Sequence, residues 1–286
     1  MKVGALCAGY GGLELGLSQL TETELVWFSE INQTADLVMR TRFDSCKNYG
    51  DVKNITLPGE VDIVTAGFPC QPFSVAGKMK GMKDEEKWLI DDICRIASEA
   101  NAKWLILENV KGIITANNGH AIARTVEAMA LSGFTRWEWG TIPASAVGAP
   151  HKRERWFCVA TNTDKIAGEK FNFRDGERCR KESWQYRGAK NEPSRFSFSR
   201  SSFEKYQPAI DRWEKIIGRR APEPYQDYRL NKRFVEWMMG LPEDWVCGDD
   251  LAIPKTYAFQ VMGNGVVPQQ AAYAIKTLIG RLQNGE

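Results

Sequence analysis

The fold is decided by one stretch near the start of the sequence, Val3-Gly4-Ala5-Leu6-Cys7-Ala8-Gly9-Tyr10-Gly11-Gly12-Leu13. The apolar run from Val3 to Leu6 is typical of a buried β-strand. The glycines that follow predict a tight turn before a helix that begins at about Leu13. Such a turn lets the backbone approach a bound molecule closely, and the first amides of the helix would face that molecule. A turn without a ligand has the same pattern, so this stretch alone predicts the fold rather than the function.

Beyond this turn, short apolar runs alternate with amphipathic stretches through the first 161 residues. Further strands are predicted at residues 25–28, 62–66, 104–107 and 156–160, and helices at 31–39, 88–100 and 120–131. This alternation is typical of a parallel sheet with crossover helices. Residues 1–161 are therefore expected to form a Rossmann-like α/β domain.

The pattern changes after Asn162, where Ser, Arg and Gly become frequent and helical periodicity is found only at 234–239 and 269–282. Residues 162–254 are therefore interpreted as a smaller, irregular domain. The last helix has an apolar face that needs to be covered, made of Ala271, Ala272, Ile275, Leu278 and Ile279. Residues 255–286 are for that reason expected to return to the first domain.

Composition limits the kind of protein. The 286 residues are 43% hydrophobic and 26% charged, as in ordinary globular proteins. No apolar run approaches the roughly 18 residues that a membrane span needs. The seven cysteines include no C-x-x-C pair, which argues against a disulfide framework and against a zinc site. A cytoplasmic monomer with no metal ion and no membrane contact is expected.

The net charge of +2 is unevenly distributed along the chain. Between Asp164 and Arg233 the sequence has 18 Lys and Arg against 11 Asp and Glu, with aromatic residues interleaved among them. Basic side chains attract phosphates, and aromatic rings pack against bases or sugars. This basic stretch therefore indicates nucleic-acid binding, although a solvated, loop-rich surface has the same composition.

Two acidic residues follow predicted strands. Glu30 comes after the second strand, and Asp51 follows Gly50 near the end of a further short strand. A carboxylate in this position commonly accepts hydrogen bonds from ribose hydroxyls. Each residue alone is compatible with an exposed acid, but together with the glycine-rich turn they favour a nucleoside-containing cofactor.

The sharpest chemical feature is Gly67-Phe68-Pro69-Cys70-Gln71, which follows the third predicted strand. Cys70 is therefore expected at the carboxyl edge of the sheet, where ligands bind and where a thiolate can act as a nucleophile. Glu108 follows the fourth predicted strand and is expected at the same edge. A carboxyl in such a crevice should have a raised pKa and can donate a proton to a ring nitrogen.

Arg153 and Arg155 stand two residues apart, directly before the apolar strand at 156–160. In an extended chain, residues at this spacing point to one side. The two guanidinium groups are therefore expected to face a phosphate or a carbonyl oxygen together. An ordinary basic surface patch is the alternative.

Taken in order, these segments resemble the motifs of the bacterial and phage DNA (cytosine-5)-methyltransferases. The matching elements are A-G-x-G-G at Ala8–Gly12, P-C-Q at Pro69–Gln71, E-N-V at Glu108–Val110, the arginine element at His151–Arg155, a stretch at Arg233–Pro242 and G-N-x-V at Gly263–Val266. The resemblance covers nearly all of the chain outside the basic stretch. It implies an S-adenosylmethionine-dependent methyltransferase fold, a target-recognition domain at 162–254 and double-stranded DNA as the substrate, within restriction–modification.

The resemblance also implies roles for particular residues. Cys70, Glu108, Arg153 and Arg155 would be catalytic. S-adenosylmethionine would bind to Cys7, Ala8, Gly9, Gly11, Gly12, Glu30, Ile31, Asp51, Val52, Pro69, Leu89, Asn264, Gly265 and Val266. Gln71, Ser74, Gly77, Lys78 and Arg233 would contact DNA.

In the mechanism that the resemblance implies, Cys70 adds to C6 of a cytosine flipped out of the duplex, so that C5 can take the methyl group. Protonated Glu108 would bind N3, and Arg155 with Arg153 would bind O2. Loss of the C5 proton and elimination would then free Cys70. Residues 74–87 are expected to form a loop that closes over the base.

Four positions depart from the family pattern. His151 stands in place of Gln, Cys7 in place of an aromatic residue, Ile31 in place of Trp and Gly265 in place of Ser. Weaker stacking on the adenine is expected from the changes at Cys7 and Ile31, and the change at Gly265 is expected to be mild.

Two alternatives remain open. A tRNA cytosine-5 methyltransferase of the same family would carry a C-F-T element, which this sequence does not contain. A catalytically silent DNA-binding protein would not need Cys70, Glu108 and the two arginines together. Methyltransferases that act on amino groups carry a D/N/S-P-P-Y/F element, which is also missing from the sequence.

Overall fold

The computed structural model describes residues 1–44, 46–69, 88–166, 169–174 and 204–284. Several residues that the sequence singles out, namely Cys70, Gln71, Ser74, Gly77 and Lys78, lie outside the described residues. The expected closing loop at 74–87 and much of the basic stretch also lie outside them.

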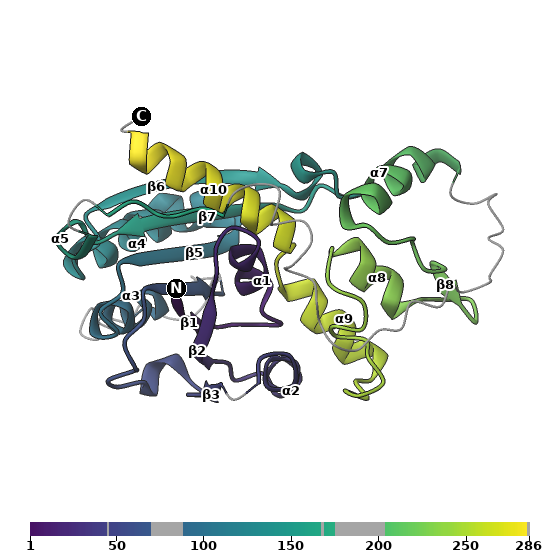
Figure 1. Ribbon diagram of the computed structural model, residues 1–286, viewed down its shortest axis with the longest axis horizontal. Coiled ribbons are helices and arrows are strands. Elements are labelled where there is room, and N and C mark those ends of the chain that lie inside the picture. The colour runs from purple at the N-terminus through teal and green to yellow at the C-terminus, as the bar shows by residue number, and fades with distance from the viewer. Residues whose placement is uncertain (45, 70–87, 167–168, 175–203, 285–286) are drawn as a thin grey trace.

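Among the described residues, seven strands form one sheet in the order β3-β2-β1-β4-β5-β7-β6 (Figure 1). Their bounds are β1 (Lys2–Leu6), β2 (Glu24–Ser29), β3 (Lys47–Asn48), β4 (Ile63–Gly67), β5 (Trp104–Val110), β6 (Arg136–Pro143) and β7 (Glu154–Thr161). The first five strands in this order run parallel, as βαβ connections require. The predicted α/β class is confirmed.

The sheet differs from the prediction at its last two strands. β7 runs antiparallel to both β5 and β6, so the sheet is mixed rather than parallel throughout. β6 is not predicted from the sequence, because Arg136–Pro143 alternates polar and aromatic residues and is only half-buried along most of its length. An edge strand of this kind has no apolar run to mark it.

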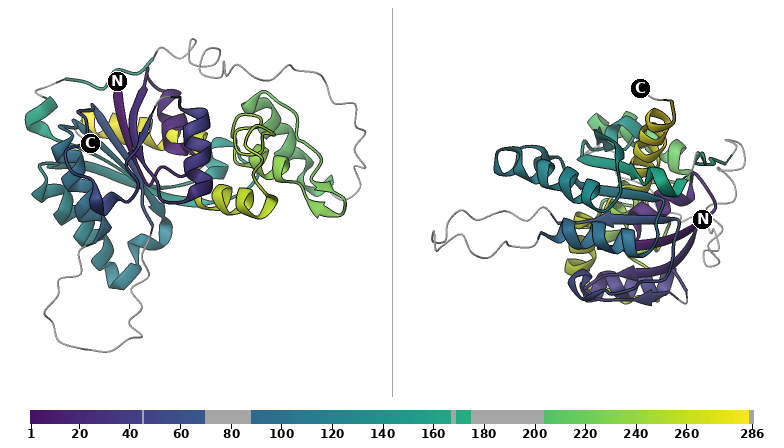
Figure 2. Two further views of the ribbon diagram at one scale, coloured as in Figure 1. Left: turned by 90° about the horizontal axis from the view of Figure 1, so that it is seen from below. Right: turned by 90° about the vertical axis from the view of Figure 1, so that its left-hand side faces the viewer.

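Helices cover both faces of the sheet (Figures 1 and 2). The helices α1 (Gly12–Ser18) and α10 (Pro268–Asn284) pack together on one face, and α10 also crosses β6 and β7. On the other face lie α3 (Leu89–Glu99) and α4 (His120–Leu131). The predicted apolar face of the last helix is buried in this arrangement.

β5 is covered on both sides, as a central parallel strand should be. Leu105 and Leu107 belong to the apolar cluster beneath α3 and α4, whereas Trp104 and Ile106 pack in the cluster beneath α10. The alternation follows from the two-residue period of a strand. Glu108 and Asn109 also lie within β5, so the predicted end of this strand at residue 107 is too early.

The region after residue 203 contributes most of a second apolar cluster, which also includes residues of the first part of the chain such as Tyr10 and Val38. It contains α7 (Gln207–Ile217), a hairpin of β8 (Tyr225–Gln226) and β9 (Arg229–Leu230), α8 (Lys232–Met238) and α9 (Lys255–Asn264). Trp213 and Trp237 are fully buried there, and Trp213 Nε1 donates a hydrogen bond of 2.9 Å to the Trp237 carbonyl. The prediction of helix only at 234–239 in this region is wrong, because the apolar faces of α7 and α9 are narrow.

The remaining elements are one further helix and several short turns. The helix α2 (Gln33–Arg42) begins two residues later than predicted, because the Asn32 side chain caps it by accepting the N–H groups of Thr34 and Ala35. A single helical turn, α5, spans Thr163–Ile166. The 3₁₀ turns are η1 (Val52–Asn54), η2 (Lys111–Ile114), η3 (Ala116–Gly119), η4 (Ala144–Val147) and η6 (Glu204–Tyr206).

Within the ranges that the structure describes, no helix has both the length and the apolar character that crossing a membrane requires. In the same ranges, no three His, Cys, Asp or Glu side chains come close enough together to hold a metal ion.

Arg42, at the end of α2, ties the sheet domain to the segment before α9. Its side chain is 2% exposed and forms an ion pair with Asp250. Its Nε donates a hydrogen bond of 2.8 Å to the Trp245 carbonyl, and its Nη2 also bonds the Asp244 carbonyl. One guanidinium group therefore satisfies the buried Trp245 carbonyl and also binds two partly exposed acceptors.

We expect Arg42→Ala to lower the free energy of unfolding by about 3 kcal/mol, because it removes a buried side chain and leaves the buried Trp245 carbonyl without its donor. Denaturant unfolding monitored by tryptophan fluorescence measures this. Arg40→Ala, on the same helix, removes the exposed pair with Asp36 and should cost about 0.5 kcal/mol or less. Equal costs for the two variants would contradict the role given to Arg42.

Candidate functional site

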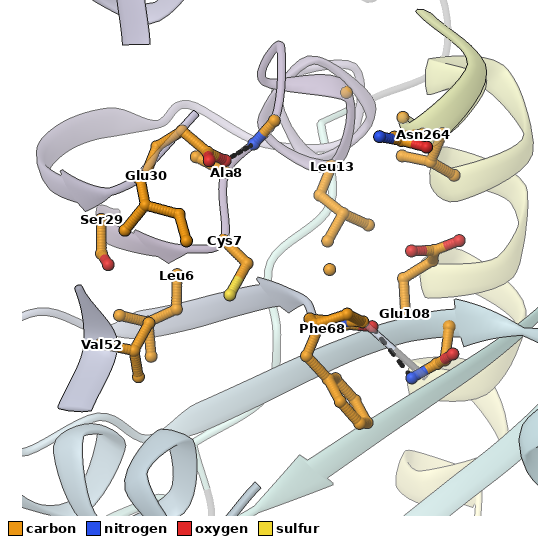
Figure 3. A pocket seen from close by; sticks show the side chains of 18 of the residues that line it. Leu6, Cys7, Ala8, Leu13, Ser29, Glu30, Val52, Phe68, Glu108 and Asn264 are labelled. Atoms are coloured by element: carbon orange, nitrogen blue, oxygen red, sulfur yellow. Dashed lines mark hydrogen bonds between the residues drawn. The ribbon is translucent and has the colours of Figure 1, made fainter. Parts of the chain in front are cut away.

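A cavity of 530 Å³ lies where the parallel strands end (Figure 3). Its walls come from the residues at or after the carboxyl ends of β1, β2, β4 and β5, from the first turn of α1 and from residues 263–266. This is the usual ligand site of an open α/β sheet, and the volume is that of a small-molecule or cofactor site.

The predicted cofactor residues gather around this cavity. All of them except Gly11 line it, namely Cys7, Ala8, Gly9, Gly12, Glu30, Ile31, Asp51, Val52, Pro69, Leu89, Asn264, Gly265 and Val266. Gly11 instead caps α1 with a φ of 82°, and a Cβ there would lie 2.6 Å from the Phe43 ring. Its role is to let the chain turn from β1 into α1.

Sequence reasoning missed several lining residues, which are Leu6, Leu13, Glu14, Ser29, Gly50, Gly67, Phe68, Asn109, Val110 and Gly263. Leu6, Ser29 and Gly67 are the last residues of β1, β2 and β4. The rule that ligands bind at the carboxyl ends of strands could have found these three. No signal in the sequence marks Glu14, which lies on a helix.

Glu30 holds the glycine-rich turn against the end of β2 (Figure 3). Its Oε2 accepts a hydrogen bond of 2.8 Å from the Gly9 amide, and its Oε1 accepts one of 2.8 Å from the Asn32 amide. These two hydrogen bonds hold the Glu30 carboxylate in one orientation at the wall of the cavity.

Glu108 and Arg155 form a buried ion pair at the floor of the site. Arg155 Nε lies 3.0 Å from Glu108 Oε1, and the side chains are 13% and 9% exposed. Burial raises the pKa of the Glu108 carboxyl to about 7, although the nearby Arg155 and Arg153 charges act to lower it. Desolvation of the carboxylate outweighs its pairing, so a substantial fraction of Glu108 carries a proton near neutral pH.

The two arginines of the predicted pair have different partners. Arg153 has a φ of 33° and precedes β7, so the expected extended alternation does not run through it. Its Nη2 donates to the carbonyl oxygens of Gly263 and Gly265, the first at 2.7 Å. Arg155 alone of the two lines the cavity. Arg153 therefore joins β7 to the loop that closes the cofactor side of the site.

The start of the Cys70 segment is held from β5. Gly67, the last residue of β4, is paired with Glu108, and a Cβ on Gly67 would lie 3.4 Å from Glu108 Oε2. The Asn109 side chain donates a hydrogen bond of 3.0 Å to the Phe68 carbonyl (Figure 3). The chain therefore leaves the sheet at Gly67, beside the Glu108 carboxyl and three residues before Cys70.

Cys7 also lines the cavity, but its thiol is not activated. Burial, with the nearby carboxylates of Glu30 and Asp51, raises the pKa of Cys7 to about 12. A thiol with such a pKa stays protonated near neutral pH and is a poor nucleophile.

Tyr10 locks the glycine-rich turn to the C-terminal loop. Its hydroxyl donates a hydrogen bond of 2.6 Å to the Val266 carbonyl, and its own carbonyl accepts one of 2.8 Å from Trp245 Nε1. A Cβ on Gly265 would lie 2.0 Å from the Tyr10 ring. The expectation that glycine is a mild change at residue 265 is therefore wrong, because the tyrosine occupies the space of any side chain there.

Two further predicted residues are engaged within the protein. The ring of His151 forms a hydrogen bond of 3.0 Å with the Met238 carbonyl, and burial lowers its pKa. Arg233, a predicted DNA contact, forms ion pairs of 2.8 Å with Asp244 and 3.4 Å with Asp249. Its side chain is half-buried, so its charge is already partly balanced.

A mostly parallel sheet with a cofactor-sized cavity at its carboxyl edge is the architecture of S-adenosylmethionine-dependent methyltransferases. Residues 1–217 match the family described as C-5 cytosine-specific DNA methylase, and the chain belongs to this family.

Curated relatives are similar over part of their length. The chain is 35% identical over 162 residues to the Type II methyltransferase M.CviJI of Paramecium bursaria Chlorella virus IL3A, which covers 56% of this chain and 42% of that protein. It is 32% identical over 165 residues to the Type II methyltransferase M2.BsuMI of Bacillus subtilis (strain 168), with the same coverage of each chain. The similarity therefore spans about two fifths of the length of these relatives.

Solved structures are similar in fold over the whole chain. The S. pombe Dnmt2 methyltransferase superimposes with a TM-score of 0.63 at 16% identity, covering 99% of each chain. A DNA modification methyltransferase described as putative and encoded within an E. coli prophage superimposes with a TM-score of 0.61 at 20% identity, again covering 99% of each chain. At these identities the similarity establishes the fold alone.

We expect Gly265→Ser to lower the free energy of unfolding by about 1–3 kcal/mol, because the new Cβ displaces the Tyr10 ring. In a Tyr10→Leu background the same substitution should cost less. A double-mutant cycle by thermal denaturation measures this coupling. Additive effects would show that the two residues do not compete for one space.

The raised pKa of Glu108 makes stability depend on pH. Because folding raises this pKa from its usual 4.5 to about 7, the carboxyl stabilises the fold below pH 4.5 and this contribution is lost as the pH rises through 7. Glu108→Gln cannot titrate, so the stability of the variant relative to wild type should increase by up to about 3 kcal/mol between pH 4.5 and 8. Urea unfolding at several pH values tests this, and a constant difference would mean that Arg155 keeps Glu108 ionised.

Proposed function

We propose that the protein is a DNA cytosine-5 methyltransferase. It transfers a methyl group from S-adenosylmethionine to C5 of a cytosine within a short duplex site, through a covalent adduct with Cys70. The observation that carries this proposal is the Glu108 carboxyl, with a pKa of about 7, buried beside Arg155 at the edge where β4 leads to Cys70. Membership of the cytosine-5 family supports the same activity.

The residues around the cavity fit S-adenosylmethionine. The Glu30 and Asp51 side chains lie on the side of β2 and can accept the donors of an adenosine, and Ile31 and Val52 offer apolar contacts to its ring. Asn264 and Val266 close the opposite wall. When bound, the cofactor supplies an electrophilic methyl group on a positively charged sulfur.

Cytosine C5 needs activation before it can take this methyl group. Addition of the Cys70 thiolate to C6 makes C5 an enamine carbon, and negative charge develops toward N3 and O2. The protonated Glu108 carboxyl gives its hydrogen to N3, and Arg155 binds O2, so both stabilise this charge. After C5 has taken the methyl group, water or a nearby base removes the C5 proton, elimination breaks the bond between C6 and sulfur to release the Cys70 thiolate, and N3 returns its proton to Glu108.

The target base must leave the helix, because C6 is shielded within a stacked duplex. Gln71, Ser74, Gly77, Lys78 and Arg233 are proposed to contact the DNA. Residues 162–254 are proposed to carry target recognition, with residues 1–161 as the catalytic part and 255–286 packed against it. The basic composition of 164–233 supports an interaction with phosphates.

The protein is further proposed to act as a monomer in the cytoplasm, without a metal ion. The Type II names of its relatives support a place in restriction–modification. Transfer of tritium from labelled S-adenosylmethionine separates this function from its alternatives. Label is expected in duplex DNA and at C5 of cytosine. Label in tRNA alone, or in neither nucleic acid, would contradict the proposal.

We expect Cys70→Ser to reduce methyl transfer by more than a hundredfold, because a serine hydroxyl is far less nucleophilic near neutral pH. Binding of S-adenosylmethionine should survive, and calorimetry checks it. Cys46→Ser is the matched control, since Cys46 is half-buried and donates to the Leu25 carbonyl away from the cavity. Retention of more than a few per cent of the wild-type rate by Cys70→Ser would overturn the covalent step.

A further inference from the structure

Glu14 is a buried acid in the wall of the cavity that the proposed reaction does not use. It lies in the first turn of α1 and is 6% exposed. One carboxyl oxygen, Oε1, accepts a hydrogen bond from the Thr65 hydroxyl on β4. The other, Oε2, is buried and has no hydrogen-bond partner among the described residues.

A buried carboxyl oxygen without a hydrogen-bond donor is unfavourable, and a ligand that supplies a donor removes this cost. Burial raises the pKa of the Glu14 carboxyl, and no ion pair in the described part of the chain includes it. Thr65, whose hydroxyl donates to Oε1, is uncharged. The other titratable side chains lining the same cavity are Cys7, Glu30, Asp51, Glu108 and Arg155. The site is therefore rich in carboxyl groups and is suited to a positively charged ligand.

We propose that Glu14 binds the α-ammonium group of the methionine end of S-adenosylmethionine. This inference rests on the proposed function. The ligand has two positive centres, but only the ammonium carries N–H groups that can satisfy the free oxygen of Glu14. The sulfonium has no hydrogen to donate.

The positions of the acids in the sheet support this assignment. Glu30 follows β2, whereas Glu14 contacts β4, and β1 lies between these strands. Two strand spacings separate them by roughly 10 Å. An S-adenosylmethionine whose adenosine meets Glu30 can therefore reach Glu14 with its amino-acid end.

Binding should also release protons. An ammonium beside Glu14 favours its charged form, so the fraction that is protonated in the free protein loses its proton when the ligand binds. The affinity for the ligand should accordingly rise with pH in the wild type and rise less in Glu14→Gln. Glu108 titrates in the same cavity, and Glu108→Gln is the matched control for its contribution.

Calorimetry with three ligands tests the proposal. S-adenosylmethionine has both positive centres, S-adenosylhomocysteine keeps the ammonium without the positive sulfur, and 5′-methylthioadenosine has neither. Glu14→Gln keeps the shape of the side chain and can still accept from Thr65. The substitution should lower the affinities for S-adenosylmethionine and S-adenosylhomocysteine by about tenfold or more. The affinity for 5′-methylthioadenosine should change by less than twofold. Glu108→Gln should leave the affinities for S-adenosylhomocysteine and 5′-methylthioadenosine within twofold.

Proton release is read by repeating the titrations in buffers of different ionisation enthalpy. Wild-type protein should release protons from Glu14 when the ligand binds. This release should persist in Glu108→Gln and be lost in Glu14→Gln. An equal loss of affinity for all three ligands would show that Glu14 has a structural role. A loss of affinity for S-adenosylmethionine alone would show that Glu14 interacts with the sulfonium. Either result would contradict the proposal. Unchanged binding of all three would also overturn the proposal.

These outcomes are distinct from a failure of the proposed function. Binding of S-adenosylmethionine that depends on Glu14, without methyl transfer to cytosine, would contradict the function and keep the inference. Methyl transfer to DNA with affinities that do not depend on Glu14 would contradict the inference alone.

Discussion

The ion pair between Glu108 and Arg155 depends on one antiparallel strand in an otherwise parallel sheet. The parallel strands all end at the edge that carries the cavity. Because β7 runs the other way, it begins at that edge, and Arg155 near its start is paired with Val110 at the end of β5. A parallel β7 would place the same arginine at the opposite edge. The reversal thus brings the Arg155 guanidinium group to the Glu108 carboxyl, whose pKa burial raises to about 7.

The same reversal connects the two ends of the chain. Arg153, just before β7, bonds the carbonyls of residues 263 and 265, and Tyr10, just after β1, bonds the carbonyl of Val266. The C-terminal loop is therefore held from both sides before α10 covers the sheet. In the proposed reaction, residues 263–266 line the cofactor side of the cavity, and Glu108 and Arg155 bind the base. The contacts of Arg153 and Tyr10 with this loop support both parts of the site. Displacement of the loop would then disturb both the binding of the cofactor and the position of the arginines.

Much of the central architecture could be predicted because buried parallel strands are short apolar runs. β1, β4 and β5 are of this kind, and the glycine-rich turn marks the ligand edge between strand and helix. The positions of Glu30 and Glu108 followed from their places after or near the ends of strands. β6, α7 and α9 could not be predicted in this way, since their apolar residues alternate with polar ones and are buried by partners distant in the sequence. Glu14 was missed for a related reason: only tertiary packing shows that its carboxyl lacks a partner.

The function assigned to this geometry depends on a bond between Cys70 and the target base. Duplex DNA of mixed sequence, with 5-fluorocytosine replacing cytosine, tests that bond most directly, because fluorine at C5 cannot leave as a proton and elimination is blocked. In the presence of S-adenosylmethionine, a protein–DNA complex that survives denaturation is expected, and peptide mass spectrometry should place the adduct on Cys70. Methylation of normal DNA with no trapped complex, or an adduct on another residue, would contradict the covalent mechanism.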